Sequence, residues 1–384
     1  MQEDSDADDL FTPRRVAVVG ATDREGSVGR AILANLDGFD GDVVAVNPSR
    51  DAVLGRPCYP DIGSVPDPVD LAVVVVPADA VAGVLRDAGE AGVSNAVVIT
   101  AGFGETGGGG ASRERELVEV AEAYDLTVVG PNCLGVMSTR SSLNASFGPT
   151  MPDQGSVAFM SQSGAFITAV LDWAADEEFG FSDVVSLGNK ASEDETDFMR
   201  RWADSEETNV VVAYLESVVD GRAFIDAARE VTRTTPVVAV KSGRTDAGAQ
   251  AASSHTGAIA GSEAAYEAGF EQAGVIRAET VEEFFDFARA LDGLPIPDRD
   301  RVAVVTNAGG PGVMTTDAIG DSRLEMAAFA DETRDALREA LPSNANIHNP
   351  VDVVGDGDAE RFETALSAVL ADDAVGAVVV VAAP

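Results

Sequence analysis

Short runs of valine and other apolar residues recur along the first 145 residues, and polar segments separate them. Two of these segments, 28–36 and 111–124, show the apolar spacing of a helix. Continuous β-branched runs that alternate with helices are typical of a parallel sheet covered on both faces. The pattern predicts a doubly wound α/β domain whose ligand lies beyond the carboxyl ends of the strands. The expected strands are residues 16–19, 43–46, 71–76, 96–99 and 127–129.

The same alternation continues in two further segments of the chain. A stretch with two prolines and few apolar residues, 143–155, indicates a junction after the first domain. We expect an acidic disordered tail over 1–11 and three domains over 12–145, 155–295 and 300–384. The fold class is therefore α/β, with tandem doubly wound parallel-sheet domains. The later strands are expected at 157–160, 184–187, 210–215, 237–240, 275–276, 301–306, 351–354 and 375–381, and further helices at 165–173 and 331–341.

The charge of the chain limits its partners. The net charge is −39, so nucleic acid and anionic membranes are poor partners for most of the surface. Lys190 and Lys241 are the only lysines, and the other 24 basic residues are arginines. Such an acidic, lysine-poor composition is typical of a halophile with a high-salt cytoplasm, where salt screens the repulsion. The acidic start is neither a secretory signal nor a transit peptide, and the longest apolar run, 377–383, is too short to span a membrane. We expect a cytoplasmic protein.

The cysteines offer no metal site and no disulfide framework. Cys58 and Cys133 are only two and are far apart in the sequence, so we expect packed free thiols.

Glycine and polar loops follow the strands of the first domain. The loop Gly20–Gly29 could bring its backbone close to a phosphate at a helix N-terminus, although an ordinary turn explains it equally well on its own. Its spacing is not G-x-G-x-x-G, and Asn47 stands where a nicotinamide site needs an acid for the ribose. Three more such loops, at 76–77, 100–104 and 130–133, are expected on the same sheet edge. Together the four loops favour a ligand site at this edge, and Asn47 disfavours a nicotinamide cofactor as that ligand.

The second domain contains a helix start and a histidine loop that suit anions. The strand at 157–160 leads into Ser161-Gln162-Ser163-Gly164 and a helix, which is either an anion seat or a plain helix cap. His255 lies among small residues in the stretch 241–261, and without context a surface histidine is the simpler explanation. Glu216 ends a strand, where its carboxylate could orient an imidazole or simply face solvent.

Nine motifs in this order resemble one enzyme family. They are VVGATDREGSVG, VNPSRDAVLGRPCYP, ITAGFGE, GPNCLGV, SQSGAF, SLGNKASEDETD, YLESVVDGR, VKSGRTDAGAQAASSHTGAIAG and VTNAGGPG. The chain, over about residues 12–384, resembles the NDP-forming acyl-CoA synthetases, especially ADP-forming acetate–CoA ligases, and more distantly the alpha subunit of succinyl-CoA synthetase. The resemblance implies a Rossmann-like CoA-binding domain followed by two flavodoxin-like domains of the succinyl-CoA-synthetase type.

The resemblance also implies a role for each motif. His255 would be the phosphorylated histidine and Glu216 its carboxylate partner. The phosphate would be held by Ser161, Gln162, Ser163, Gly164, Ser254 and Gly257. The CoA site would be lined by Gly20, Ala21, Thr22, Ser27, Val28, Gly29, Asn47, Pro48, Ser49, Thr100, Ala101, Gly102 and Asn132.

The reaction implied is acyl-CoA + ADP + phosphate to acid + ATP + CoA, most simply with acetate. No ATP-grasp module is recognisable, so ADP/ATP and Mg²⁺ are expected on an ATP-grasp beta subunit or a fused C-terminal region. The third domain is shorter than is usual in the family, which favours a truncated alpha-like chain, and we expect an oligomer. Three alternatives are the synthetase-like region of a protein acetyltransferase, a non-catalytic CoA-binding regulatory module and an NAD-linked dehydrogenase. The intact SSHTGA sequence argues against the acetyltransferase region, and the second domain's phosphate motifs argue against a non-catalytic module. Asn47 argues against the dehydrogenase.

Overall fold

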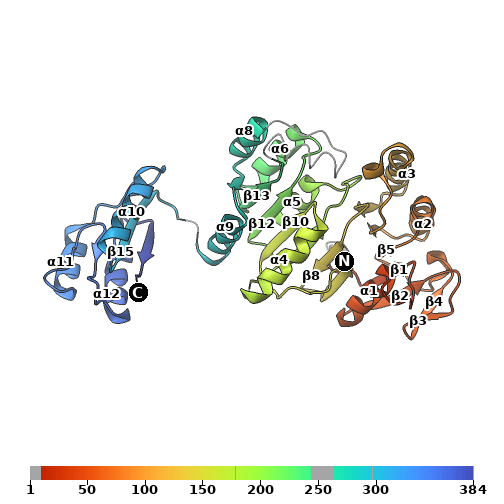
Figure 1. Ribbon diagram of the computed structural model, residues 1–384, viewed down its shortest axis with the longest axis horizontal. Coiled ribbons are helices and arrows are strands. Elements are labelled where there is room, and N and C mark those ends of the chain that lie inside the picture. The colour runs from red at the N-terminus through yellow and green to blue at the C-terminus, as the bar shows by residue number, and fades with distance from the viewer. Residues whose placement is uncertain (1–9, 178, 244–262, 296, 384) are drawn as a thin grey trace, which may run out of the picture. The chain divides into compact units, whose positions relative to one another are not determined.

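The structure, a computed structural model, describes residues 10–177, 179–243, 263–295 and 297–383. The chain divides into two compact units, one up to Leu294 and one from Pro295. Figure 1 labels their helices and strands, and each unit is described by itself.

The first sheet is the parallel sheet expected from the valine-rich runs. Its strand order is β3-β4-β2-β1-β5-β6-β7, and all neighbours pair in parallel except β3 with β4. Its elements are β1 (Arg15–Val19), β2 (Asp42–Val46), β3 (Ala52–Val53), β4 (Arg56–Tyr59), β5 (Leu71–Val74), β6 (Asn95–Val98), β7 (Thr127–Val129), α1 (Val28–Asn35), α2 (Ala78–Glu90) and α3 (Gly108–Tyr124).

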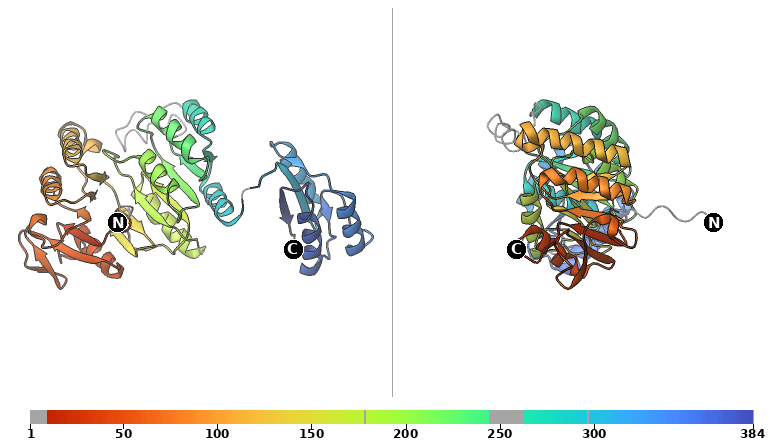
Figure 2. Two further views of the ribbon diagram at one scale, coloured as in Figure 1. Left: turned by 180° about the vertical axis from the view of Figure 1, so that it is seen from behind. Right: turned by 90° about the vertical axis from the view of Figure 1, so that its right-hand side faces the viewer.

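Helices cover both faces of this sheet. Alternate residues of β1 point to opposite faces. Val16 and Val18 pack with α1 in one apolar cluster, and Ala17 and Val19 pack with α2 and α3 in another. Helices α2 and α3 lie side by side in Figures 1 and 2. The doubly wound arrangement is confirmed.

The second sheet has the order β14-β13-β12-β10-β11-β8-β9. The strands from β14 to β11 run parallel, whereas β8 and β9 are antiparallel additions at one edge. Its elements are β8 (Gly135–Ser138), β9 (Leu143–Ser146), β10 (Val157–Ser161), β11 (Asp183–Ser186), β12 (Val210–Leu215), β13 (Val237–Lys241), β14 (Ile276–Ala278), α4 (Gly164–Asp176), α5 (Glu195–Ala203), α6 (Gly221–Val231), α8 (Glu263–Ala273) and α9 (Val281–Gly293).

This sheet is also covered on both faces. Phe159 of β10 points toward α4 and α9, and its neighbours Ala158 and Met160 share a cluster with α5, α6 and α8. Figure 2 shows the same helices from behind.

Two expectations near the domain borders need correction. Residues 143–146 were expected to begin the junction, but they form β9, which pairs with β8 and so extends the second sheet. Leu10 and Phe11 were assigned to the disordered tail, yet both side chains are fully buried. Phe11 stacks on Trp202 of α5, with 6.1 Å between ring centroids. One apolar cluster therefore runs continuously from α1 through Phe11 and β9 to α5 and α6.

The second unit is a small parallel sheet in which β16, β17 and β18 all pair with β15. Leu337 and Val369 from two of its helices pack on one face of the sheet, and Ile319 packs on the other. Val379 and Val380 of β18 are partly exposed. The elements are β15 (Arg301–Thr306), β16 (Glu325–Met326), β17 (Val351–Asp352), β18 (Ala377–Val381), α10 (Gly309–Gly320), α11 (Asp331–Ala340) and α12 (Ala359–Leu370).

Candidate functional site

The loops after β1, β2 and β5 surround a mostly apolar cavity of about 480 Å³. Gly20, Asn47 and Pro48, three of the residues expected at the CoA site, line it together with Val76 and Pro77. In the sheet, β1 lies between β2 and β5, so the chain's crossovers diverge here. Such a switch point is where doubly wound domains bind ligands.

The glycines at this cavity are required by close backbone approach. Gly20 has φ +95°, and a Cβ there would lie 2.2 Å from the Val75 carbonyl oxygen. A Cβ on Gly29 would lie 2.7 Å from the Gly20 carbonyl oxygen. The first turn of α1, which begins at Val28 after the N-cap Ser27, is thereby pressed against the loop.

Polar side chains hold this loop to the next one. The Asn47 Nδ2 donates to the Ala21 carbonyl oxygen at 2.8 Å, and its Oδ1 accepts the Ser49 N–H at 2.9 Å. The Thr22 hydroxyl oxygen accepts the Arg24 N–H. Asn47 therefore fixes loop geometry with both ends of its amide.

The other expected CoA residues lie further along the same edge. Thr100 donates its hydroxyl to the Val76 carbonyl oxygen at 2.7 Å and accepts the Asn132 N–H on its own carbonyl oxygen at 3.0 Å. Thr100, Ala101, Gly102 and Asn132 do not line the 480 Å³ cavity. They follow β6 and β7, one and two strands beyond β5.

A carboxylate that the sequence did not single out occupies this part of the edge. Glu105 accepts the Gly102 N–H at 2.5 Å and the Phe103 N–H at 3.1 Å. Burial raises the pKa of Glu105, but the amide of Asn189 and these backbone N–H groups outweigh burial, so the pKa lies below its ordinary value. Glu105 is thus an ionised clamp on the Gly102 loop.

The start of α4 has the expected cap at the end of β10. Ser163 is the N-cap, and its hydroxyl oxygen accepts the Phe166 N–H at 3.3 Å. The buried Ser161 hydroxyl accepts the Ser163 N–H at 3.0 Å. The carboxyl end of β10 thus delivers the N-terminus of α4, beginning at Gly164, to the sheet edge, where its dipole favours an anion.

Gln162 joins β10 to β12. Its Oε1 accepts the N–H groups of Glu216 and Ser217 at 2.6 and 2.9 Å, and its Nε2 donates to the Ser217 hydroxyl at 3.2 Å. Its side chain therefore ties the two strand ends together, and the two expected site residues Gln162 and Glu216 are in direct contact.

Lys241 ends β13 next to Glu216, because Leu215 and Lys241 are register partners. Its ammonium lies 4.5 Å from the centre of the Tyr266 ring and donates to the Ser242 carbonyl oxygen. Burial lowers the pKa of Lys241, and the carboxylates of Glu263 and Glu216 oppose this effect without cancelling it.

Lys190, the other lysine, also reaches this edge. Its Nζ donates to the Glu195 carboxylate at 2.8 Å and to the Ser217 carbonyl oxygen at 2.7 Å. The exposed fractions of the two charged side chains are 2% and 0%. Sequence reasoning noted both lysines only for their rarity. Because the other basic residues are arginines, the scarcity of lysine is the sequence feature that could have pointed to Lys190 and Lys241 as residues of this site.

His255, Ser254 and Gly257 lie outside the described residues, so their expected roles rest on the sequence. The strand that precedes them, β13, ends at the same edge as Gln162 and Glu216.

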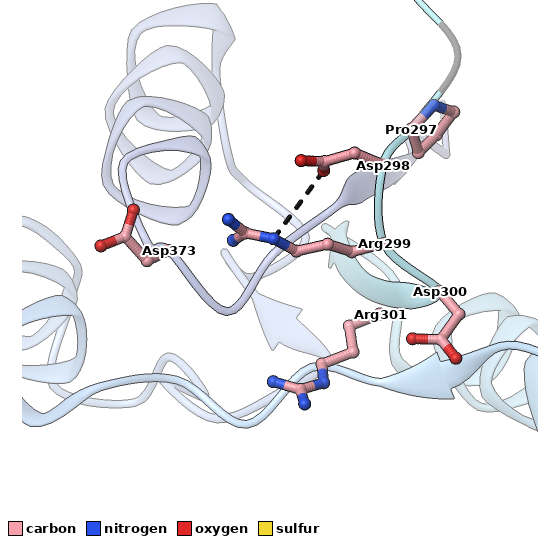
Figure 3. Close-up of a pocket in the computed structure, with 6 residues that line it drawn as sticks. All are labelled: Pro297, Asp298, Arg299, Asp300, Arg301 and Asp373. Atoms are coloured by element: carbon pink, nitrogen blue, oxygen red, sulfur yellow. Dashed lines mark ion pairs between the residues drawn. The ribbon is translucent and has the colours of Figure 1, made fainter.

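A further cavity lies in the second unit. Figure 3 shows its charged lining, with Asp298 directed toward Arg299, whose ion pair measures 3.8 Å. It is open and about 720 Å³ in volume, and it is lined by Pro297, Asp298, Arg299, Asp300, Arg301 and Asp373. Among the helices described, none combines the length and apolar character needed to cross a bilayer.

Three family models match consecutive parts of the chain. They describe a CoA binding domain over residues 14–139, a succinyl-CoA ligase like flavodoxin domain over 154–291 and a Ligase-CoA domain over 302–382.

Solved and curated relatives extend over nearly the whole chain. The dinucleotide-forming acetyl-coenzyme A synthetase 1 of Ca. Korarchaeum cryptofilum, solved with phosphate and ADP, matches with a TM-score of 0.92 at 41% identity, covering 97% of this chain and 81% of that one. Acetate–CoA ligase [ADP-forming] I of Archaeoglobus fulgidus is 49% identical over 98% of this chain, which spans 54% of that relative.

The chain spans about half the length of this relative and of two other curated relatives. A shorter relative, the alpha subunit of acetate–CoA ligase [ADP-forming] II of Pyrococcus furiosus, is 42% identical, and the match covers 95% of this chain and 80% of that subunit. This chain belongs to the family of ADP-forming acetate–CoA ligases and corresponds to its alpha-type region.

Proposed function

We propose that this chain binds CoA in its first domain and carries a phosphoryl group on His255, as the alpha-type part of an ADP-forming acetate–CoA ligase. One observation carries the proposal: Glu216, Lys241 and the N-terminus of α4 meet at one sheet edge. Lys241 ends β13, and the segment that contains His255 follows β13 in the sequence.

The proposed chemistry has three balanced steps. A phosphate oxygen attacks the thioester carbonyl carbon, the C–S bond breaks, and CoA leaves, which gives an acyl phosphate. A neutral His255 nitrogen then attacks the phosphorus, the P–O bond to the acyl group breaks, and the acid leaves. Finally the phosphoryl group passes from His255 to ADP, which gives ATP and free histidine.

The described residues suit the second step. The α4 N-terminus with Ser161 and Ser163 favours the charge of the transferring phosphoryl group. In this proposal Glu216 accepts an imidazole N–H and holds the ring in one tautomer. The nucleotide and Mg²⁺ belong, in this proposal, to an ATP-grasp module that is a beta subunit or a fused region.

The test is phosphoryl labelling in molar KCl. This chain, a family ATP-grasp module, Mg²⁺ and labelled ATP should give an acid-labile, base-stable label on the chain. His255→Asn should abolish both the label and turnover, and His348→Asn, which changes the other histidine, should leave both intact. A label that persists in His255→Asn would overturn the assignment. Turnover with acetate, propionate, branched-chain and aryl acids then identifies the acid.

The nucleotide step has its own test. We expect residues 1–384 alone to bind CoA without making ATP from acetyl-CoA, ADP and phosphate, and we expect the added ATP-grasp module to provide ATP synthesis. Robust ATP synthesis by the purified chain alone would show that it contains a nucleotide site.

A further inference from the structure

One turn, Gly188-Asn189-Lys190, contacts both candidate sites through adjacent side chains. It follows β11 and lies against the loop after β7. The Asn189 N–H donates to the Pro131 carbonyl oxygen at 2.9 Å, and a Cβ on Gly188 would lie 2.2 Å from that oxygen. Lys190 has φ +57°, a left-handed conformation that a side chain rarely adopts without compensation. The turn is thus held tightly in an unusual shape.

Asn189 faces the first domain. Its Nδ2 donates to the carboxylates of Glu105 and Glu114, both at 2.7 Å, and its Oδ1 accepts from the Asn132 amide at 3.2 Å. The Glu105 carboxylate in turn holds the Gly102 N–H. The two amide hydrogens of one asparagine therefore hold two carboxylates and, through them, the loop that is expected at the CoA site.

Lys190 faces the second domain. Its buried ammonium binds Glu195 and the Ser217 carbonyl oxygen, next to Glu216. Glu195 also accepts the Val219 N–H at 3.2 Å. Lys190 and Glu195 thus fix the backbone that follows Glu216. A buried ion pair is a weak source of stability, because well-packed apolar residues often stabilise a fold equally well. The specific effect of this pair is therefore on the position of the backbone that it binds.

We propose that the Asn189-Lys190 turn is a positioning element for both sites: Asn189 fixes the CoA loop of the first domain, and Lys190 fixes the Glu216 segment of the second domain. The inference rests on the proposed function, since it assumes that CoA and the phosphoryl group are handled at these two edges.

The test separates the two residues by their effects on binding and on transfer. Asn189→Asp is isosteric but places a third carboxylate against Glu105 and Glu114, so we expect CoA affinity by calorimetry to fall at least tenfold with the rate of His255 labelling unchanged. Lys190→Met should slow labelling at least tenfold and leave CoA affinity within twofold. Lys190→Arg, which keeps the charge in a larger head group, should recover part of the labelling rate.

A double variant distinguishes position from stability. Lys190→Met alone leaves Glu195 buried without its partner and should lower Tm, whereas Lys190→Met with Glu195→Met removes both charges and should recover Tm. Labelling should stay slow in the double variant, because the Ser217 carbonyl is still released. The matched control is Arg140→Met, which removes the ion pair between Arg140 and the buried Asp183 at the other end of β11 and should lower Tm with labelling unchanged.

Two outcomes would overturn the proposal. One is recovery of labelling together with Tm in the double variant, and the other is that Asn189→Asp and Lys190→Met each change both CoA affinity and labelling. Absence of label in the unmodified chain would instead contradict the proposed function. In that case the Asn189→Asp calorimetry still decides the link to the CoA loop.

Discussion

The Gln162 side-chain oxygen lies 2.6 Å from the backbone nitrogen of Glu216 and accepts its N–H. The same oxygen accepts the Ser217 N–H, so one amide holds the backbone that carries the proposed partner of His255. Gln162→Leu leaves two partly buried N–H groups without their acceptor, and each such group costs about 1–3 kcal/mol of stability. We expect lower stability and slower His255 labelling, with CoA affinity unchanged. The control is Asn209→Ala, at the opposite end of β12, which should change neither the labelling rate nor the CoA affinity. An unaltered labelling rate in Gln162→Leu would contradict a positional role for Gln162.

Gly29 tests the CoA edge. Because a Cβ at this position would lie 2.7 Å from the Gly20 carbonyl oxygen, Gly29→Ala must shift either the α1 start or the glycine loop. We expect CoA affinity, measured by calorimetry in high salt, to fall at least tenfold, and NAD not to bind the unmodified chain. Gly83→Ala, in α2 of the same domain, meets nothing within 4 Å and should bind CoA normally. Equal CoA affinity in both variants would place the site elsewhere.

Glu193 gives the fold a pH dependence. Burial and the nearby Asp197, opposed by Arg201, raise the pKa of Glu193 from 4.5 to about 7. Between these values the folded chain binds more protons than the unfolded chain, so stability falls as pH rises from about 4.5 through 7. Glu193→Gln should remove this loss and raise the free energy of unfolding at pH 8 by about 1–2 kcal/mol, after allowance for solvent screening. Urea titrations at pH 5 and pH 8 measure this change in the free energy of unfolding, and the exposed Glu207→Gln is the control. Stabilisation by Glu193→Gln at pH 5 alone would contradict a raised pKa of Glu193.

Phe11 tests whether the segment that precedes β1 belongs to the core. Its ring is fully buried and packs against Trp202 and Phe198. Phe11→Ala should lower the free energy of unfolding by about 3 kcal/mol, since a cavity is left between α5 and the chain start. Phe147, whose exposed fraction is 40%, provides the matched control, and Phe147→Ala should cost well under half as much. Similar Tm values for the two variants would argue against Phe11 as part of the core.

The central strands could be predicted because their sequences are buried on both faces and therefore continuously apolar. β8 and β9, with the sequences GVMS and LNAS, could not be predicted in this way. They are short and partly polar, and their burial arises from a position between the two sheets. Leu10 and Phe11 were missed for a related reason, since they follow an acidic stretch and the ring partners of Phe11 lie in α5, far away in the sequence.

The candidate site was predictable only to the level of loops. Parallel strands place their carboxyl ends at one edge, so the pattern placed the loops of Gln162 and Glu216 at that edge but did not predict their contact. The hydrogen bonds of Asn189 to Glu105 were not predictable either, because nothing local in GNKAS indicates a partner 84 residues earlier. The low pKa of Glu105 likewise depends on that distant amide.

The apolar cluster that joins α1, Phe11 and β9 to α5 and α6 has a consequence for the evolution of the chain. The rings of Phe11, Phe198 and Trp202 pack together, so a larger side chain at Phe11 requires a smaller one at Trp202 or Phe198. Recombination between relatives near residue 150 would join two halves of a core that were never selected together. Such hybrids should arise as viable proteins mainly between parents that share these contact residues, and this part of the molecule is therefore inherited as a block.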